Sequence, residues 1–416
     1  MRILVLGSGA REHSVIRALL NDPSDYEIIA APGNAGISEE VVVAELRIED
    51  PEAVSEFARD HQIELVIVGP EAPLIAGVAG ALRTSGIPVF GPSTEAAAIE
   101  GSKSFAKEIM ASAKIPTAKS VLVATEKELA EALDGLNSPH VVKADGLAGG
   151  KGVVVTEDRD QAMAHGTKHL QNGNVLVEEF LEGQEVSLFF ISDGTSIIPL
   201  SPAQDYKRAF DHDRGPNTGG MGAYSPVPWL DDSFIKNVTE TIARPVVSEL
   251  KSRGTPFVGL LYCGLIVQKS EVKVIEFNAR FGDPETQAVL ARLKSPLGPM
   301  LLAAASGRLN EIEPPEFDSS CSIVVVIASE GYPDHPTVGR KIIGLENLPK
   351  ISSVSICHGA TKWVGSDLFS TGGRVLSVVS IGKTFSLARD NAYETINLLH
   401  LEGSYFRTDI GLRVST

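Results

Sequence analysis

Two alternate residues of one predicted strand could hold a divalent metal ion. Residues 272–278 read VKVIEFN, and side chains alternate between the faces of a strand, so Glu276 and Asn278 point the same way. Carboxylate and amide oxygens suit Mg²⁺ or Mn²⁺, which usually also bind nucleotide phosphates. An exposed strand edge is the alternative, although the strongly apolar neighbour at 258–268 should be a central strand.

A glycine-rich hairpin could cover a polyphosphate. Residues 141–155 read VVKADGLAGGKGVVV, which places Gly149, Gly150, Lys151 and Gly152 between two β-branched runs. A Walker loop leads into a helix, whereas this loop leads into a strand. Its backbone amides could approach phosphate oxygens closely, and Lys143 and Lys151 supply cations. A surface hairpin with solvated lysines is the less favoured alternative.

Polar residues that follow the metal pair could bind a small substrate. Arg280 opens the segment RFGDPETQ at 280–287 and could clamp carboxylate or phosphate oxygens bidentately. The segment NTGGMG at 217–222 could bring backbone amides to a small substrate. A local arginine–aspartate salt bridge and a flexible linker are the respective alternatives.

The first glycine turn, GSGARE at 7–12, stands where a dinucleotide-binding GxGxxG turn would. Glu12 replaces the third glycine, and the second predicted strand ends in Ala31-Pro32 without an acid for a ribose diol. Both features of a dinucleotide site are therefore missing. A phosphate could still sit at the helix N-terminus, where Arg11 would strengthen its binding. A turn that only lets helix and strand pack is an equal alternative.

An acidic turn between two predicted strands could contact a nucleoside. Residues 177–185 read VEEFLEGQE and lead from one strand into the next. Such a segment could offer backbone groups to an adenine edge, and Glu185 could accept hydrogen bonds from a ribose diol. A simply solvated turn is the alternative.

These candidates must be positioned by two kinds of sheet. Up to about residue 90, short strands alternate with helices, which predicts an open parallel sheet whose ligands bind at the carboxyl ends of its strands. Beyond residue 116 hairpins replace this alternation, and Pro314-Pro315 marks a boundary. The predicted strands are 2–6, 26–31, 65–68, 88–90, 140–145, 152–156, 175–180, 186–192, 258–268, 272–277, 322–328 and 374–381. Helix signals follow the first glycine turn to about residue 20, and the other predicted helices are 51–61, 75–85, 106–113, 160–170, 233–253 and 385–401.

Bulk composition narrows the class of protein. The 416 residues, 43% hydrophobic and 22% charged, fit a globular protein of two to four domains. The net charge of -16 disfavours nucleic-acid binding. Three cysteines without a CxxC pair indicate neither a zinc site nor a disulfide framework. No stretch approaches the ~20 apolar residues of a membrane helix, so we expect a cytoplasmic protein without membrane partners.

Together these segments resemble the phosphoribosylamine–glycine ligase family of the ATP-grasp superfamily. The resemblance runs through nearly the whole chain, and RFGDPETQ is specific to this family, whereas the glycine hairpin alone would indicate only ATP-grasp. It is carried by GSGAREH at 7–13, APGNAG at 31–36, VGPEAPL at 68–74, FGPS at 90–93, EGSKSFAK at 100–107, the hairpin at 141–155, GPNTGGMGAYSP at 215–226, EFNARFGDPETQ at 276–287, ASEGYP at 328–333 and GGRVL at 372–376.

The resemblance implies a fold with both α/β and α+β parts. The N-terminal open parallel α/β domain, of the pre-ATP-grasp type, would span 1–103. An ATP-grasp domain would span 104–318, with a mobile flap at about 118–183, and a small mixed α+β C-terminal domain would span 319–416.

The implied reaction uses ATP and Mg²⁺ or Mn²⁺ to join glycine to 5-phosphoribosylamine through glycyl phosphate. By similarity, ATP would lie on Lys103, Lys143, Gly149, Gly150, Lys151, Gly152, Glu178, Leu181 and Glu185. The ribosylamine phosphate would face Gly9, Arg11, Asn34 and Glu71, and glycine would face Asp213, Asn217, Gly219, Gly220, Met221 and Arg280. The metal ligands would be Glu276 and Asn278, and the catalytic residues Arg280 and Asp283.

Other hypotheses remain open at this point. Another ATP-grasp carboxylate–amine ligase would keep the fold with a different substrate. An NAD(P)-dependent oxidoreductase is disfavoured by the first turn, and a non-catalytic metabolite-binding protein by the retained metal pair. The sequence leaves the oligomeric state open and is compatible with a monomer.

Overall fold

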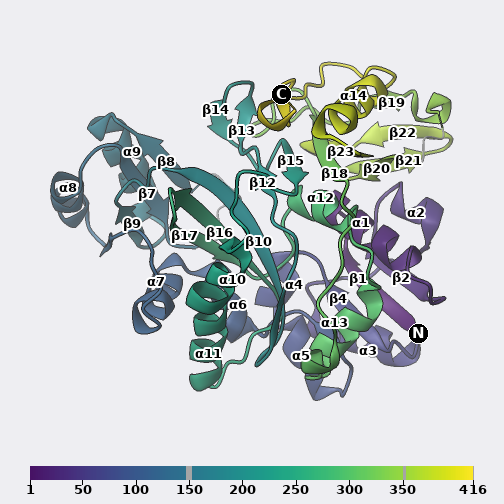
Figure 1. The fold of residues 1–416 in the computed structure, drawn as a ribbon, viewed down its shortest axis with the longest axis horizontal. Coiled ribbons are helices and arrows are strands. Elements are labelled where there is room, and N and C mark those ends of the chain that lie inside the picture. Colours follow the sequence, from purple (N-terminus) through teal and green to yellow (C-terminus); the bar gives the residue numbers. More distant parts are fainter. Residues whose placement is uncertain (147–151, 350–352, 416) are drawn as a thin grey trace.

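The N-terminal part of the molecule is the predicted parallel sheet with helices on both faces (Figure 1). The computed structural model describes residues 1–146, 152–349 and 353–415. The strand order is β3-β2-β1-β4-β5, and every pair is parallel. The strands are β1 (Arg2–Gly7), β2 (Glu27–Pro32), β3 (Val42–Val43), β4 (Leu65–Val68) and β5 (Val89–Phe90). Continuous apolar runs suit them because both sheet faces are covered.

The helices of this part begin near the carboxyl ends of the strands. They are α1 (Ala10–Leu20), α2 (Ile37–Glu40), α3 (Pro51–Asp60), α4 (Glu71–Ile75), α5 (Val78–Thr84), α6 (Thr94–Gly101) and α7 (Lys103–Ser112). The predicted helix at 75–85 corresponds to α5, which begins only at Val78 because Gly77 adopts a left-handed φ of 89° and separates it from α4, a helix that was not predicted.

A small antiparallel sheet with two helices projects from the rest of the molecule, at the left of Figure 1. Its order is β6-β9-β7-β8, with strands β6 (Ser120–Val123), β7 (His140–Ala144), β8 (Val153–Thr156) and β9 (Val175–Glu178). Helices α8 (Glu126–Gly135) and α9 (Arg159–Leu170) pack on it through a separate hydrophobic cluster that includes Leu129 and Val177. Helix α8 was not predicted, although Thr125 and Glu128 form a capping box at its start.

The central antiparallel sheet carries the predicted metal pair. Its order is β11-β10-β16-β17, with strands β10 (Gln184–Asp193), β11 (Ile197–Pro199), β16 (Val258–Gln268) and β17 (Glu271–Asn278). The apolar β16 is internal, as expected, and β17 is the edge strand. The predicted helix at 233–253 is divided into α10 (Phe234–Val238), a π-helical turn at Thr239–Ala243 and α11 (Arg244–Ser252).

The C-terminal sheet includes strands from the middle of the chain. Its order is β12-β15-β18-β23-β20, and β15 (Gly222–Ser225) pairs with β18 (Cys321–Ala328) across the boundary expected near residue 318. The other strands are β12 (Gln204–Asp205), β20 (Val354–His358) and β23 (Arg374–Gly382). A second small sheet contains β19 (Lys341–Ile343), β21 (Thr361–Val364), β22 (Asp367–Ser370) and β24 (His400–Leu401), and a two-stranded ribbon contains β13 (Arg208–Phe210) and β14 (Arg214–Asn217).

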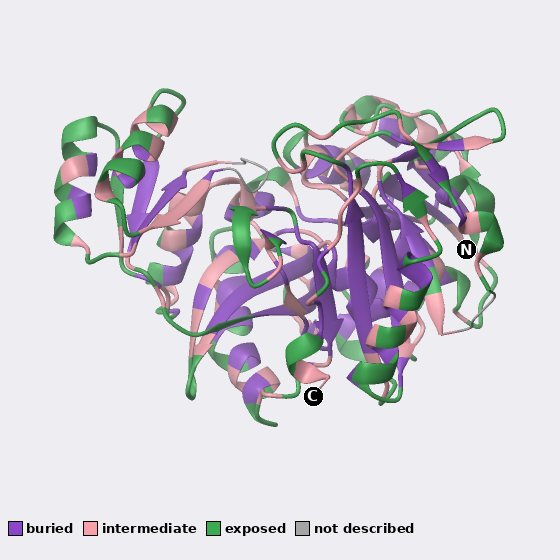
Figure 2. Cartoon of the chain, turned by 90° about the horizontal axis from the view of Figure 1, so that it is seen from above, coloured by how far each residue is buried: buried purple, intermediate pink, exposed green. Residues whose placement is uncertain are grey.

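The remaining helices join these parts into one packed molecule. They are α12 (Glu285–Leu290), α13 (Leu297–Ala305) and α14 (Phe385–Ile396), which ends before the predicted residue 401. Buried residues of β1, β10, β16 and α13 share one hydrophobic cluster, so the first and central sheets have a common core. Figure 2 shows these buried strands in the middle and exposed residues on the surrounding helices and loops. In the described part of the chain, no helix is long and apolar enough to cross a membrane.

Candidate active site

Glu276 and Asn278 lie on the same face of β17, as their spacing predicts. They stand opposite Gly264 and Tyr262 of β16, and a register shift leaves Ile275 without a partner next to Glu276. The Glu276 side chain is 38% exposed, and its Oε1 lies 3.8 Å from Lys207 Nζ. The pair is therefore accessible at the end of an edge strand, so topology alone would also permit the exposed-edge alternative.

The electrostatic environment distinguishes Glu276 from an ordinary edge residue. Burial opposes its ionisation, but the charges of Lys207, Lys143 and Lys103 outweigh burial and hold the pKa of Glu276 below its usual value. Burial lowers the pKa of Lys103, Glu276 opposes that shift, and Lys143 adds to it. One carboxylate is thus kept ionised beside three cations, which is the charge pattern of a site for a polyphosphate and its metal.

The donor set fits a metal ion of the magnesium type. Across residues 1–146, 152–349 and 353–415, no group of three or more His, Cys, Asp or Glu side chains could hold an ion by itself. One carboxylate and one amide suit an ion that takes its remaining ligands from phosphate oxygens and water. Glu276 and Asn278 therefore fit a metal that binds together with a nucleotide.

The base of the glycine hairpin lies next to this pair. Lys143, at the end of β7, donates to the backbone oxygen of Ile275 over 3.4 Å. Its Nζ is also 2.9 Å from Glu178, which Lys107 approaches to 3.3 Å. Lys103 Nζ donates to Gly146 O at 3.0 Å. These contacts bring residues predicted to bind ATP together from three elements.

Other residues predicted to bind ATP are placed less completely. Gly149, Gly150 and Lys151 lie outside the described residues, whereas Gly152 accepts a 2.7 Å hydrogen bond from Ala144 N where the hairpin closes. The half-buried Leu181 lies in the connection from β9 to β10, as predicted. Glu185 follows on β10, exposed to solvent.

Lys207 and Asp205 belong to this site but were missed. Lys207 Nζ lies 2.7 Å from Glu185 Oε2, so it connects the predicted ribose ligand with Glu276. Burial raises the pKa of Asp205, whereas Glu185, Asp205 and Glu276 outweigh burial and raise the pKa of Lys207. Asp205 ends β12 and Lys207 lies between β12 and β13, in a stretch for which no element was predicted, so no recognised pattern marked either residue.

Arg280 is held by two carboxylates from the N-terminal part. Its Nη2 lies 3.1 Å from Glu100 and its Nε 3.5 Å from Glu71. Burial opposes ionisation of Glu71, but Arg280 outweighs it and lowers the pKa of that carboxyl group. Burial raises the pKa of Glu100, which also accepts a 2.7 Å hydrogen bond from Ala279 N and was not predicted. Arg280 and Glu71 thus lie together, although they are far apart in the sequence.

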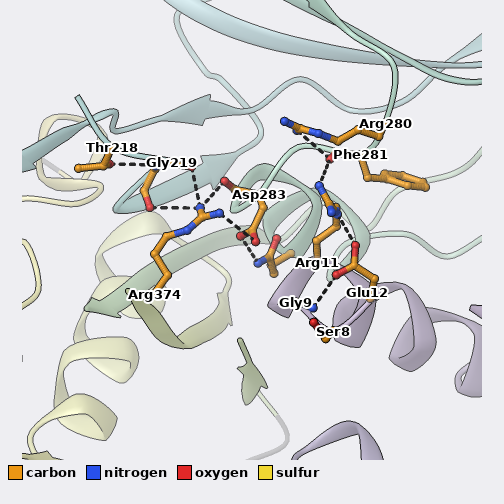
Figure 3. Close-up of polar contacts among 12 residues, drawn as sticks. Ser8, Gly9, Arg11, Glu12, Thr218, Gly219, Arg280, Phe281, Asp283 and Arg374 are labelled. Atoms are coloured by element: carbon orange, nitrogen blue, oxygen red, sulfur yellow. Dashed lines mark hydrogen bonds and ion pairs between the residues drawn. The ribbon is translucent and has the colours of Figure 1, made fainter. Parts of the chain in front are cut away.

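The first turn is closed by Glu12, the residue that replaces the third glycine (Figure 3). Its carboxylate accepts hydrogen bonds from Gly9 N at 2.7 Å and from Arg11 Nε at 2.5 Å. A Cβ atom at Gly7 would lie only 2.5 Å from Glu12 Cγ. Arg11 also donates to Phe281 O at 3.2 Å. The glutamate therefore caps α1 and fills the turn, which explains why this chain lacks the dinucleotide pattern.

A second group of predicted residues surrounds Asp283. A Cβ atom at Gly9 would lie 3.9 Å from Asp283 Oδ2, so the first turn and this loop are close. Asn34 Nδ2 donates to Ser8 O at 2.8 Å and to His358 O at 2.7 Å. A cavity of about 330 Å³ joins these segments to the C-terminal part. Its lining includes Gly9, Asn34, Asp283, Thr361 and Arg374.

The predicted glycine-facing segment divides between two environments. Gly219 and Gly220 contact Arg374 near Asp283, and Met221 is fully buried behind them. Asn217 ends β14. Asp213 instead forms ion pairs with Arg407 at 3.0 Å and with Arg413 at 3.2 Å. The structure therefore places Gly219 and Gly220 beside Arg374, which lines the cavity. The Asp213 side chain is instead paired with two arginines near the C-terminus.

The sheets and the charged site define an ATP-grasp protein. A crystal structure of biotin carboxylase from Campylobacter jejuni shares this fold, with a TM-score of 0.69 and 17% identity over 99% of this chain and 94% of that chain. Family models for phosphoribosylglycinamide synthetase match consecutive segments: the N domain at 1–100, the ATP-grasp (A) domain at 101–286 and the C domain at 322–413.

Full-length relatives agree with these models. Phosphoribosylamine–glycine ligases from Leifsonia xyli and Mycobacterium tuberculosis are 55% and 48% identical, with 99% and 100% of this chain and 100% and 99% of theirs aligned. The crystal structure of the Thermotoga maritima phosphoribosylamine–glycine ligase matches with a TM-score of 0.85 and 32% identity, over 98% of this chain and all of that one. The chain belongs to the phosphoribosylamine–glycine ligase family.

Proposed function

We propose that this chain is the cytoplasmic ATP-dependent ligase that joins glycine to 5-phosphoribosylamine, giving glycinamide ribonucleotide, ADP and phosphate in the second step of de novo purine biosynthesis. The observation that carries the proposal is the convergence of Glu276 with lysines from three other segments, in a chain that aligns with the family over its full length. Phosphoryl transfer depends mainly on positioning and charge neutralisation, which this arrangement supplies.

The nucleotide is bound between the projecting sheet and the central sheet. Lys103 and Lys143 neutralise phosphate oxygens, and the glycine hairpin at 149–152 covers them. The connection from Glu178 through Leu181 to Glu185 receives the adenosine. Glu276 and Asn278 would hold Mg²⁺ or Mn²⁺, which would supply positive charge to neutralise the nucleotide phosphates.

Two steps join the substrates. A carboxylate oxygen of glycine attacks the γ-phosphorus of ATP, ADP leaves, and glycyl phosphate forms. The amine of 5-phosphoribosylamine then attacks the acyl carbon, phosphate leaves with the former carboxylate oxygen, and the nitrogen loses a proton. Arg280 orients the anionic groups, and holding the reactants in line contributes up to roughly 7–11 kcal/mol of barrier reduction.

Different segments of the chain face the two substrates. Gly9, Arg11, Asn34 and Glu71 face the ribosylamine phosphate. The loop that contains Gly219 and Gly220 faces glycine, together with Asn217 and Arg280. The division into units at 1–103, 104–318 and 319–416 serves this arrangement, and the flap at about 118–183 closes over ATP and excludes water from glycyl phosphate.

The test is ADP formation with defined substrates. We expect ADP release from ATP and a divalent metal only when glycine and freshly prepared 5-phosphoribosylamine are both present. ADP release that required a different carboxylate would retain the ligase class and reject the substrate assignment. The absence of substrate-dependent ADP release with any carboxylate and this amine would reject the function.

A further inference from the structure

One arginine of the C-terminal sheet holds the loop predicted to face glycine and the loop that carries Asp283, a predicted catalytic residue (Figure 3). Arg374 begins β23, and its Nη1 donates to Gly219 O and to Asp283 O, each at 2.6 Å. Its Nη2 lies 3.2 Å from Asp283 Oδ2. A single guanidinium group therefore fixes the distance between the Gly219 loop and the Asp283 loop.

A second residue of the C-terminal part also contacts the Gly219 loop. Tyr332, which follows β18, accepts a 2.9 Å hydrogen bond from Gly219 N through its hydroxyl oxygen. A Cβ atom at Gly219 would lie 3.0 Å from Arg374 Cζ and 3.2 Å from the Tyr332 hydroxyl, so a side chain there would displace the two groups. The Gly219 residue is thus held through its amide nitrogen and its carbonyl oxygen from one domain.

Asp283 is fixed in the same network. Its Oδ1 accepts a 2.8 Å hydrogen bond from Gln287 Nε2, and its Oδ2 faces Arg374. Gln287 is fully buried on α12, so this side of the carboxylate is anchored to the helix. Both oxygens of the Asp283 carboxylate are engaged, so this side chain links α12 to Arg374 and has no oxygen free to act as an acid or base.

We propose that Arg374 is a positioning residue for glycine and that, with Tyr332, it sets the geometry of the loop that receives this substrate. This inference rests on the proposed function. Arg374 acts through Gly219 and Asp283, so its loss should loosen the glycine site while the ATP site around Glu276 stays formed. Small displacements of substrate-positioning groups are costly because the reacting atoms must stay aligned.

The test compares the change in the KM for glycine with the change in the KM for ATP. For R374A we expect the KM for glycine to rise at least about tenfold and kcat to fall, with the KM for ATP within about twofold of wild type. R374K, which can still donate to one carbonyl oxygen, should recover part of the loss. Y332F removes a single oxygen atom and should raise the KM for glycine by about threefold, which keeps the test valid if R374A folds poorly.

R389A is the matched control, because Arg389 donates to a backbone oxygen of the same domain, that of Thr408, and should leave both KM values unchanged. Wild-type KM values for glycine in R374A and Y332F would overturn the positioning role, as would a parallel rise in both KM values. A wild-type protein whose ADP formation ignored glycine would instead reject the proposed function, so the two failures are distinguishable.

Discussion

Glu276 combines exposure with an unusual charge environment. It is one of two alternate polar residues on an edge strand, a pattern that elsewhere would face solvent without a function. Lys207, Lys143 and Lys103 keep its carboxyl group ionised although burial opposes ionisation. The alternation of the two side chains could be predicted from the strand period, whereas Lys207 could not, because it reaches Glu276 from a segment without a recognised motif.

We expect Glu276→Ala to lower turnover by at least about a hundredfold while the protein stays folded, because the change removes the carboxylate that we propose as a metal ligand. Steady-state ADP release and circular dichroism measure the two properties. Glu271→Ala, at the exposed start of the same strand, is the control and should behave as wild type. Loss of the folded signal in Glu276→Ala would show that the residue is structural.

The pKa of Lys103 gives a pH prediction. Because burial lowers this pKa, the ammonium loses its charge at a lower pH than an ordinary lysine would. The kcat/KM for ATP follows the protonation state of the free enzyme. It should therefore begin to fall at a lower pH than it would with an ordinary lysine at this position. Arginine stays charged, so Lys103→Arg should move the alkaline limb to higher pH, whereas the surface change Lys168→Arg should not. Superimposable profiles for wild type and Lys103→Arg would contradict this role.

At the scale of elements, a buried ion pair joins two strands of the projecting sheet, β7 and β9, next to the site. From the sequence, removal of Lys143 should weaken ATP binding with little loss of stability. The 2.9 Å contact of Lys143 with Glu178, which is 3% exposed, means that removal of Lys143 should also lower the stability. A buried carboxylate that loses a partner is destabilising, although Lys107 remains nearby at 3.3 Å.

Lys143→Met should therefore weaken ATP binding and lower the free energy of unfolding by up to about 3 kcal/mol. Adding Glu178→Leu should restore part of the stability without restoring ATP affinity, because it removes the buried carboxylate while Lys107 keeps its hydrogen bonds to Thr117 Oγ1 and Ala118 O. Calorimetric titration and thermal unfolding measure the two effects. A double variant no more stable than the single variant would argue against the ion pair.

The loop at Gly219-Gly220 depends on glycine for two reasons. Gly220 has a φ of 111°, and a Cβ atom there would overlap Pro284. Gly254 has a similar left-handed φ of 82° but open space around it, so it isolates the backbone contribution. We expect Gly254→Ala to cost about 1 kcal/mol and Gly220→Ala about 2–3 kcal/mol, measured by denaturant unfolding. Equal costs would show that the contact with Pro284 is unimportant.

Strand periodicity predicted the central elements well, because β16 and β17 are long and clearly patterned. It failed where the signal was local and weak. The left-handed backbone conformation of Gly77 interrupts one apolar helical stretch. Helix α8 is indicated mainly by its capping box at Thr125. The hairpin base at Lys143 was predicted, but its burial against Glu178 depends on a tertiary contact between strands.

At the scale of the whole molecule, the parts are joined by contacts between distant segments. The N-terminal parallel sheet follows directly from its alternating elements, and its carboxyl ends supply Gly9 and Glu71. The pairing of β15 with β18 lies across a predicted domain boundary, and no periodicity specifies which distant strand will pair. The role of Arg374 depends on this pairing, because the C-terminal sheet carries the guanidinium group to the Gly219 loop.

In the proposed mechanism, ATP activates the carboxylate of glycine before the amine attacks. The most direct measurement is a reaction with glycine labelled with ¹⁸O in both carboxylate oxygens, unlabelled ATP and 5-phosphoribosylamine, followed by mass analysis of the inorganic phosphate. If glycyl phosphate forms, each phosphate released carries one ¹⁸O atom and the amide product carries the other. Phosphate without ¹⁸O, formed together with the product, would contradict this mechanism.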